Sequence, residues 1–227
     1  MSDEQFKTSN FSVGKRILGV LGGQDVDDRL FKFWAKESDI LLAADAGADL
    51  ALRHGIVPDA IIGDLDSVSA DALGSGADIY KFDDENSTDC DKLLQWVVDQ
   101  GHRSIRLIGV EGDRLDHVLG TLGSCARSPL DIRLILRDGE GILLKAGHHR
   151  LEAIAGQRVS LLPVGEVEGV DAPGLRWPLM QATLQLDGFV SVSNVVETAP
   201  LEISIASGTL LVILESTQPS TMDILQP

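Results

Sequence analysis

Cysteine is nearly absent from this chain, and long apolar segments are missing altogether. Only Cys90 and Cys125 occur among 227 residues, with no CxxC pair, so the sequence indicates neither a disulfide scaffold nor a zinc knuckle. No apolar run approaches the roughly 18 residues of a membrane-spanning helix. Residues 1–12 are polar and lack the apolar segment of a secretory signal. We therefore expect no membrane partner, a cytoplasmic location, and two buried free thiols.

Positive charge is also scarce. Lysine and arginine number 19 against 35 aspartates and glutamates, which gives a formal net charge of −16. A nucleic-acid partner is not expected, because binding to a polyanion requires a basic surface. If this protein handles phosphate groups, it must use a few local cations, backbone amides and metal ions.

Hydrophobic residues make up 44% of the chain, enough for one large domain or two small ones. In the first part of the chain, short apolar runs alternate with amphipathic segments, which predicts strands that alternate with helices. The expected strands are 17–21, 40–44, one that begins after Pro58, 77–82, 104–108 and 132–136; the main helices are expected around 30–35, 49–54, 88–100 and 115–122. Such alternation predicts a mostly parallel sheet with helices on both faces.

The pattern changes near residue 140. The segments that follow are short, alternate in polarity and are interrupted by glycine or proline, which is typical of antiparallel strands. They are 142–144, 149–151, 159–162, 184–186, 189–192, 201–205 and 210–214. The expected fold class is α/β: an N-terminal, mostly parallel sheet flanked by helices over residues 14–139, followed by a smaller all-β antiparallel sandwich domain over residues 140–216.

Two aspartates follow the apolar run 60–62. In extended backbone Asp64 and Asp66 lie on the same side of the chain, with Cα atoms about 7 Å apart. Carboxylates that close repel each other unless a positive charge lies between them, and Mg²⁺ binds one or two carboxylates together with phosphate oxygens. The alternative is that both aspartates only cap the following turn. Parallel sheets bind ligands beyond the carboxyl ends of their strands, where other polar loops of this chain would also gather.

A predicted helix begins close to a third aspartate. Thr88 and Asp91 have the spacing of a capping box. Asp89 lies in the first helical turn, where the helix dipole keeps a carboxylate ionised and able to bind a cation. Lys92 could face either solvent or a phosphate group.

A glycine-rich turn leads into another helix, which begins with Arg114, Asp116 and His117. The backbone amides of this helix, together with Arg114, could bind an anion. The structural alternative is that Asp113 caps the helix and Asp116 closes a capping box, with His117 bonded to a carbonyl group.

Taken in order, these segments resemble the signature of the thiamine pyrophosphokinase family. The matching segments are Asp45-Ala46-Gly47-Ala48, Pro58-Asp59-x-x-x-Gly63-Asp64-x-Asp66-Ser67, Ser87-Thr88-Asp89-x-x-Lys92 and Gly112-x-Arg114-x-Asp116-His117. In the β-rich part the likeness continues through Ser160-Leu161-Leu162-Pro163, Gly174-Leu175-Arg176-Trp177-Pro178-Leu179 and Ser191-Val192-Ser193-Asn194. Each motif alone is weak, but their order and spacing over roughly residues 40–215 are specific.

The resemblance implies transfer of a pyrophosphoryl group from ATP to the hydroxyl group of thiamine, giving AMP and thiamine diphosphate. It implies a catalytic α/β domain that binds ATP and Mg²⁺, and a β domain that binds thiamine. Mg²⁺ would be held by Asp64, Asp66 and Asp89. Arg114 and Asp116 would lie beside the phosphates and the attacking hydroxyl group and complete the catalytic set.

The resemblance also implies a homodimer, in which thiamine lies between the α/β domain of one subunit and the β domain of the other. Asp45 would border the nucleotide or the metal ion. The residues expected to contact ATP or thiamine are Asp45, Ser67, Thr88, Lys92, His117, Trp177, Ser191, Ser193 and Asn194. For Trp177, a place in the core is the alternative to stacking on a ligand.

Two other functions compete with this interpretation. One is a related pyrophosphokinase that acts on another heterocyclic alcohol, such as a hydroxymethylpterin. The other is a non-catalytic protein that binds a nucleotide or thiamine. The clustered carboxylates argue against the second, because a binding module does not need so many of them.

Overall fold

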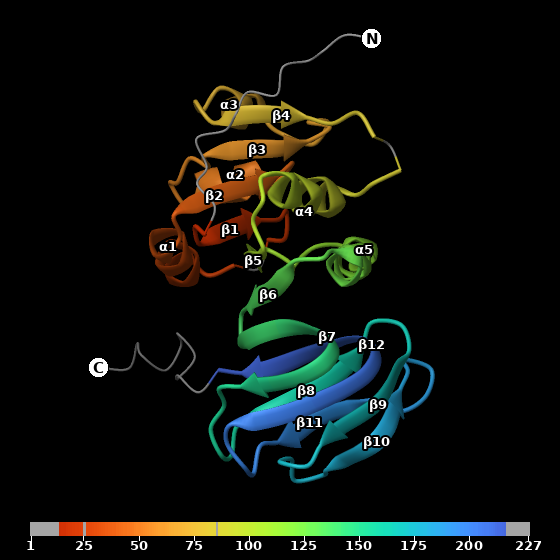
Figure 1. Cartoon of the computed structure of the whole chain (residues 1–227). Helices are drawn as coiled ribbons and strands as arrows, with labels where there is room; N and C mark the ends of the chain where they lie inside the picture. The colour runs from red at the N-terminus through yellow and green to blue at the C-terminus, as the bar shows by residue number, and fades with distance from the viewer. Residues whose placement is uncertain (1–13, 25, 85, 217–227) are drawn as a thin grey trace, which may run out of the picture.

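The computed structural model describes residues 14–24, 26–84 and 86–216. Its N-terminal part alternates strands and helices, as the hydropathy pattern predicts (Figure 1). The elements are β1 (Ile17–Val20), α1 (Asp28–Glu37), β2 (Ile40–Ala44), α2 (Gly47–Arg53), β3 (Ala60–Gly63), α3 (Ala70–Leu73), β4 (Asp78–Lys81), α4 (Asp89–Asp99), β5 (Ser104–Ile108), α5 (Leu115–Arg127) and β6 (Asp131–Leu136). The six strands form a parallel sheet in the order β6-β5-β1-β2-β3-β4.

Helices cover both faces of this parallel sheet, as expected from the central strands β1, β2 and β3, which are apolar and buried throughout. On one face Leu93 of α4 packs in a cluster with Leu107 of β5. On the other face Phe31 of α1 and Leu50 of α2 pack in a cluster with Ile61 of β3. All five side chains are at most 1% exposed, and full burial of one such side chain stabilises a fold by roughly 1.5–3 kcal/mol.

The two cysteines lie where α4 meets α5. Cys90 and Cys125 are both buried and free, as predicted. A hydrogen bond between the two thiols, together with burial, raises the pKa of Cys90 well above its usual value. Cys90 is therefore not a reactive thiolate, and both cysteines serve as small, buried side chains in the helix interface.

The C-terminal part consists of antiparallel strands. They are β7 (Gly139–Leu151), β8 (Arg158–Pro163), β9 (Val167–Ala172), β10 (Leu179–Leu184), β11 (Ser191–Val195) and β12 (Leu201–Glu215). β7 pairs antiparallel with β6 and so joins the two parts into one continuous sheet. β12 pairs with β9 near its start and with β8 from Leu210 onward, so it belongs to both layers around the core of this part. The predicted fold class, a helix-flanked parallel sheet followed by an antiparallel β region, is confirmed.

Several details of the predicted strand pattern are wrong, among them segment 184–186, because β10 ends at Leu184. Segments 142–144 and 149–151 are one strand, β7, and segments 201–205 and 210–214 are one strand, β12. The glycines that suggested turns, Gly147 and Gly208, lie at a register shift between the two strands, with φ of 146° and 94°. Glycine inside a paired strand marks a bulge and not an end. β9 has no counterpart among the predicted strands, because glycine and acidic residues interrupt its apolar positions.

The starts of the helices are set by short polar side chains. Backbone amides at the starts of three helices donate to Asp27, Ser69 and Thr88. Thr88 and Asp91 form the predicted capping box. The structural alternative in which Asp113 caps α5 is wrong: the cap position is Arg114, which makes no side-chain cap bond. Asp113 instead accepts a hydrogen bond from the Arg114 amide at 2.7 Å.

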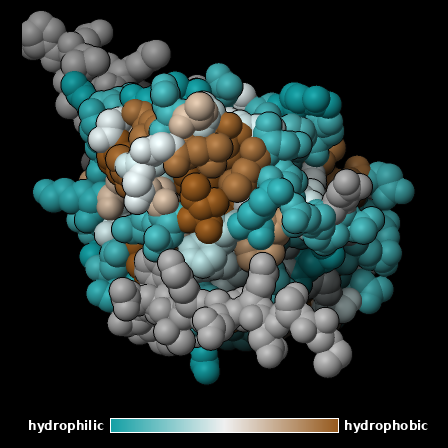
Figure 2. Space-filling view, turned by 90° about the horizontal axis from the view of Figure 1, so that it is seen from above, coloured by the Kyte–Doolittle hydropathy of each residue, from teal (hydrophilic) through white to brown (hydrophobic). Residues whose placement is uncertain are grey.

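The edge strand β4 is open to solvent. Ile79, in its middle, is 44% exposed, and the surface seen from this end is mostly hydrophilic around an apolar patch (Figure 2). Asp78 and Lys81 place a charge at each end of the strand, which disfavours pairing with another edge. Within the described ranges, none of the helices combines the length and the apolar character needed to cross a membrane.

Close packing between α2 and β1 positions the loop after β2. A Cβ atom added at Gly47 would overlap the carbonyl oxygen of Val20 and lie 2.7 Å from its carbonyl carbon. Only glycine therefore allows the first turn of α2 to approach β1 this closely.

We predict that Gly47→Ala lowers the free energy of unfolding by about 1–3 kcal/mol, because the added methyl group must displace backbone. Urea unfolding followed by circular dichroism measures the change. Gly188→Ala is the control, since its Cβ would meet only ordinary contacts of 3.5 Å or more. Equal stability of the two variants would contradict the close packing described here.

Candidate active site

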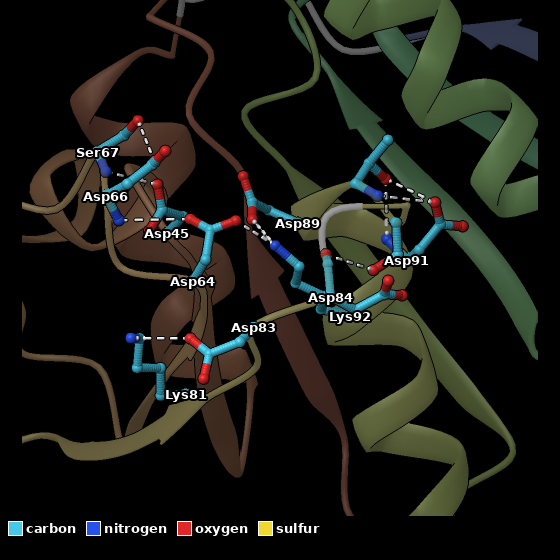
Figure 3. A network of polar contacts seen from close by, with 12 residues as sticks. Asp45, Asp64, Asp66, Ser67, Lys81, Asp83, Asp84, Asp89, Asp91 and Lys92 are labelled. Carbon is cyan, nitrogen blue, oxygen red and sulfur yellow. Dashed lines mark hydrogen bonds and ion pairs between the residues drawn. The ribbon is translucent and has the colours of Figure 1, made fainter.

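A cavity of about 390 Å³ lies beyond the carboxyl ends of β1, β2 and β3, where α4 and α5 begin. Parallel sheets bind their ligands at this edge. Nine of the residues singled out from the sequence line it: Asp45, Asp64, Asp66, Ser67, Thr88, Asp89, Lys92, Asp116 and His117. Figure 3 shows how the aspartates from three different loops turn toward one another and toward Lys92.

Three of these carboxylates form a group that could hold a metal ion. One oxygen each of Asp45, Asp64 and Asp66 lies within 4.8 Å of the others. Two hydrogen bonds between neighbouring residues hold the group: the Asp66 amide donates to Asp64 at 3.3 Å, and the Ser67 hydroxyl donates to Asp66 at 2.9 Å. Oxygen ligands at this spacing suit a hard divalent cation. The sequence-based set paired Asp64 and Asp66 with Asp89, whereas this group includes Asp45.

Asp45 is the most buried member of the group. It is 2% exposed and has a positive φ of 43° directly after β2. One carboxylate oxygen accepts from the Ser67 amide at 3.2 Å, and the other is buried without a hydrogen-bond partner among the described residues. Burial, followed by repulsion from Asp89, Asp64 and Asp66, raises the pKa of Asp45 to about 6. An unpartnered buried oxygen beside two more carboxylates is what a bound cation would satisfy.

Lys92 is the internal counter-ion of this site. Its side chain is 3% exposed and donates to both Asp64 and, at 3.2 Å, Asp89. Burial lowers the pKa of Lys92, but these two hydrogen bonds outweigh burial and the pKa is raised overall. The hydrogen bond from Lys92 to Asp64 lowers the pKa of Asp64. Burial raises the pKa of Asp89. The amine therefore stays charged and faces the carboxylates, not solvent.

The opposite wall of the cavity comes from the start of α5. Arg114 forms a two-pronged ion pair with Asp116, with distances of 3.1 and 2.7 Å, and this bonding lowers the pKa of Asp116. Asp116 lines the cavity, while the Arg114 side chain is 73% exposed and lies outside the lining. His117 Nδ1 is 3.0 Å from Asp113, and Gly120 leaves space where a side chain would stand.

The predicted residues of the β region lie apart from this cavity. Trp177 is 59% exposed, so it is not a core side chain. Asn194 is buried and bonded to the backbone of Trp177 in both directions, at 3.2 and 2.8 Å, and to Ser191 at 3.1 Å. The Ser193 amide donates to Ser160 Oγ. Within this chain, Asn194 and Ser191 hold the loop that presents Trp177.

The structure adds residues to which the sequence assigned no part in the site. Gly22, Asp113 and Thr121 also line the cavity. A second hollow of about 600 Å³ adjoins it through Gly22, Ala46 and Ser67, and extends to Gln24, Asp49, Leu52, Arg53, Ser69 and Asp71. The glycine pair after the first apolar run was a signal for Gly22. Nothing in the local sequence separates Thr121 from other residues of its helix.

Comparisons with known proteins bear on both parts of the chain. The family model described as the thiamin pyrophosphokinase catalytic domain matches residues 31–136, and that of the thiamin pyrophosphokinase vitamin B1 binding domain matches residues 148–210. Thiamine pyrophosphokinase 1 of Arabidopsis thaliana is 26% identical over 235 residues, which cover 89% of this chain and 87% of the relative. Thiamine pyrophosphokinase of Bacillus subtilis is 25% identical over 191 residues, covering 79% and 89%.

A solved structure agrees with these sequence matches. The crystal structure of thiamin pyrophosphokinase from Geobacillus thermodenitrificans superposes with a TM-score of 0.73 at 26% identity. The superposition covers 92% of this chain and all of the other. The likeness therefore includes the helix-flanked sheet, the antiparallel region and their connection.

The burial of Asp45 has a measurable consequence for stability. Its pKa in the folded protein, about 6, lies above the ordinary value of 3.8, so the folded state binds this proton more tightly than the unfolded state. Ionisation of Asp45 therefore removes stability as the pH rises through this window. In EDTA we predict that Asp45→Asn stabilises the protein by about 2–3 kcal/mol near pH 8 and by about half as much near pH 5.

Urea unfolding at the two pH values measures this gain. Asp78→Asn, which removes an exposed carboxylate on β4, is the control and should bring no comparable gain. An equal effect of Asp45→Asn at both pH values would show that burial does not disfavour the ionised carboxylate.

Proposed function

The chain belongs to the thiamine pyrophosphokinase family, and on that premise we propose that it transfers the pyrophosphoryl group of ATP to the hydroxyl group of thiamine, giving thiamine diphosphate and AMP. One observation carries the proposal: Asp45, Asp64, Asp66 and Asp89 converge with Lys92 on one cavity at the ligand-binding edge of the sheet. Clustered carboxylates can hold the metal ion that a reaction on a polyphosphate requires. A protein that only binds a ligand does not need so many of them.

We propose that Mg²⁺ is held by Asp64, Asp66 and Asp89, with Asp45 at its border. The grouping of Asp64 and Asp66 with Asp45 within 4.8 Å supports two of these ligands, and the unpartnered oxygen of Asp45 supports its place beside the ion. Asp89 completes the set from the first turn of α4. When bound, the ion would neutralise charge on the triphosphate and help to orient it for in-line attack.

The side chains of the cavity then have separate tasks. Lys92, which spans Asp64 and Asp89 here, supplies positive charge to the phosphate oxygens. Arg114 lies at the rim, where its exposed guanidinium can pair with phosphate in place of Asp116.

The reaction itself forms one bond and breaks another. The hydroxyl oxygen of thiamine attacks the β-phosphorus of ATP, the bond from that phosphorus to the oxygen bridging the α-phosphorus breaks, and AMP leaves with that electron pair. Asp116 is placed to accept the hydroxyl proton, because it lines the cavity and is ionised beside Arg114. The adjoining hollow of about 600 Å³ suits the nucleoside of ATP, with Ser67, Thr88 and His117 closing the space around the phosphates.

We propose that thiamine binds between two copies of the chain in a homodimer. Trp177, Ser191, Ser193 and Asn194 do not line the cavity of their own chain, so a contribution from a second copy would bring them to it. Large apolar side chains are exposed on both surfaces that would meet. These are Leu115 and Leu119 on α5, and Trp177, Met180 and Val192 in the β region, each at least 55% exposed.

Within this proposal, residues 14–139 form the catalytic domain that binds ATP and Mg²⁺, and residues 140–216 form the domain that binds thiamine. The change from helix-containing to purely antiparallel structure between β6 and β7 supports this division. We also propose a cytoplasmic location, where the free thiols of Cys90 and Cys125 would stay reduced.

The activity is tested by measuring AMP formed from ATP and Mg²⁺ with thiamine as acceptor, and with a hydroxymethylpterin as the alternative acceptor. We predict thiamine-dependent AMP formation that falls at least about a hundredfold in Asp64→Asn, Asp66→Asn and Asp89→Asn, because each removes charge that orients the phosphates. Circular dichroism should show that all three variants are folded. The control Asp187→Asn changes an exposed carboxylate in the β region and should retain full activity.

Mixed dimers test the shared thiamine site. Asp64→Asn and Trp177→Ala should each be nearly inactive alone, but an equal mixture that is dissociated and reassembled should regain about a quarter of the wild-type activity. Half of the dimers would then carry both variants, and each of these would contain one undamaged site. Sites made from single chains would give no recovery, because every chain carries a lesion.

A further inference from the structure

A separate cavity of about 610 Å³ lies at the opposite edge of the parallel sheet. It is bounded by the starts of β1, β5 and β6 and by the second half of β7. Because these strands are parallel and four to six residues long, their starting ends lie about 15 Å from the edge that carries the candidate active site. No residue lines both cavities.

This cavity gathers positive charge in a strongly acidic protein. Six of the chain's 19 lysines and arginines line it, together with two histidines and a single carboxylate, that of Asp131. The six are Lys15, Arg16, Arg106, Arg133, Lys145 and Arg150. Like charges this close to one another destabilise a fold unless something negative lies among them.

Part of this charge is neutralised within the chain. Arg16 pairs with Glu37 and Asp39, and Arg133 pairs with Glu140 at 2.8 Å. Lys145 donates to the backbone carbonyl of Ser128, which satisfies a donor without cancelling the charge.

Besides Lys145, three cations form no ion pair with a carboxylate among the described residues, although the charge of Lys15 acts on Asp39 at longer range. The side chains of Lys15 and Arg150 make no hydrogen bond or ion pair there. Arg106 is half-buried, and its Nε is buried with no hydrogen-bond partner. The Arg106 guanidinium lies 5.0 Å from the centre of the Trp34 ring, a contact that does not satisfy its hydrogen-bond donors.

The floor of the cavity is apolar. Ile105, Leu130, Ile132 and Leu144 line it and are all at most 6% exposed. A volume of about 610 Å³ is within the range of small-molecule sites, and an apolar floor with a few polar groups at its edge is their usual composition. An inorganic anion would use the charges but leave the floor and most of the volume empty.

We propose that this cavity binds an organic anion of nucleotide size that carries at least two negative charges. Its apolar part lies on the floor, and its phosphate or carboxylate groups pair with Arg106, Arg150 and Lys15. The proposal does not depend on the function of the first cavity, because it uses none of the residues placed there.

The test uses ADP as the probe, the full chain, and EDTA to withhold the divalent ion from the first cavity. Isothermal titration should detect ADP binding and no binding of uncharged adenosine. Arg106→Gln combined with Arg150→Gln should weaken ADP binding by at least about tenfold. The charge-matched control Arg29→Gln with Arg158→Gln, at exposed positions away from this cavity, should bind ADP as the unaltered chain does.

Trp34 provides a local readout. Binding of ADP to the Arg106 guanidinium should alter its contact with Trp34 and so change the fluorescence emission of that tryptophan. Trp34→Phe should remove this change while calorimetry still detects binding. Arg150→Gln alone, at an exposed side chain, keeps the contact with Trp34 and should weaken binding several-fold if the double variant does not fold. The proposal is overturned if ADP at millimolar concentration does not bind, or if both double variants bind it equally.

Discussion

The carboxylates around Lys92 are the constraint on which the candidate active site depends. Two unit charges 4.8 Å apart repel by about 3 kcal/mol at the effective dielectric constant of a protein surface, near 20. Asp45, Asp64 and Asp66 contain three such pairs when all are ionised. The buried amine of Lys92 offsets part of this repulsion through Asp64 and Asp89. The pKa of Asp45 stays raised, first because the carboxyl is buried and second because the other three carboxylates repel it. The site is therefore prepared for a cation at a cost to the stability of the chain.

The rest of the fold supports that arrangement. Asp45 and Asp64 follow neighbouring parallel strands, β2 and β3, so their backbones are held side by side by the pairing of Ala44 with Ile62. Thr88 is the N-cap of α4 and forms a capping box with Asp91, so the helix begins at Asp89. Leu93 and neighbouring side chains anchor α4 in the core. Repulsion among the acidic groups is thus opposed by strand pairing, helix capping and apolar burial, each acting at a different residue.

Charge is divided between the two ends of the parallel sheet. Acidic groups gather beyond the carboxyl ends of the strands, and Lys15, Arg106 and Arg150 gather with other cations at their beginnings. The net charge of −16 conceals this division. An electrostatic field of this kind would favour different ligands at the two edges: cations with their bound phosphates at one, and free organic anions at the other.

The sequence by itself determined the order of strands and helices, because the spacing of apolar residues and the caps at helix starts are local properties. It also determined the capping box at Thr88, and the motif order from which the family resemblance was stated. Only the tertiary structure decided which groups meet. It placed Asp45 with Asp64 and Asp66, turned Lys92 inward, and joined separate apolar runs into the long strands β7 and β12. These outcomes depend on contacts between residues far apart in the chain, and no local pattern contains the energy of such contacts.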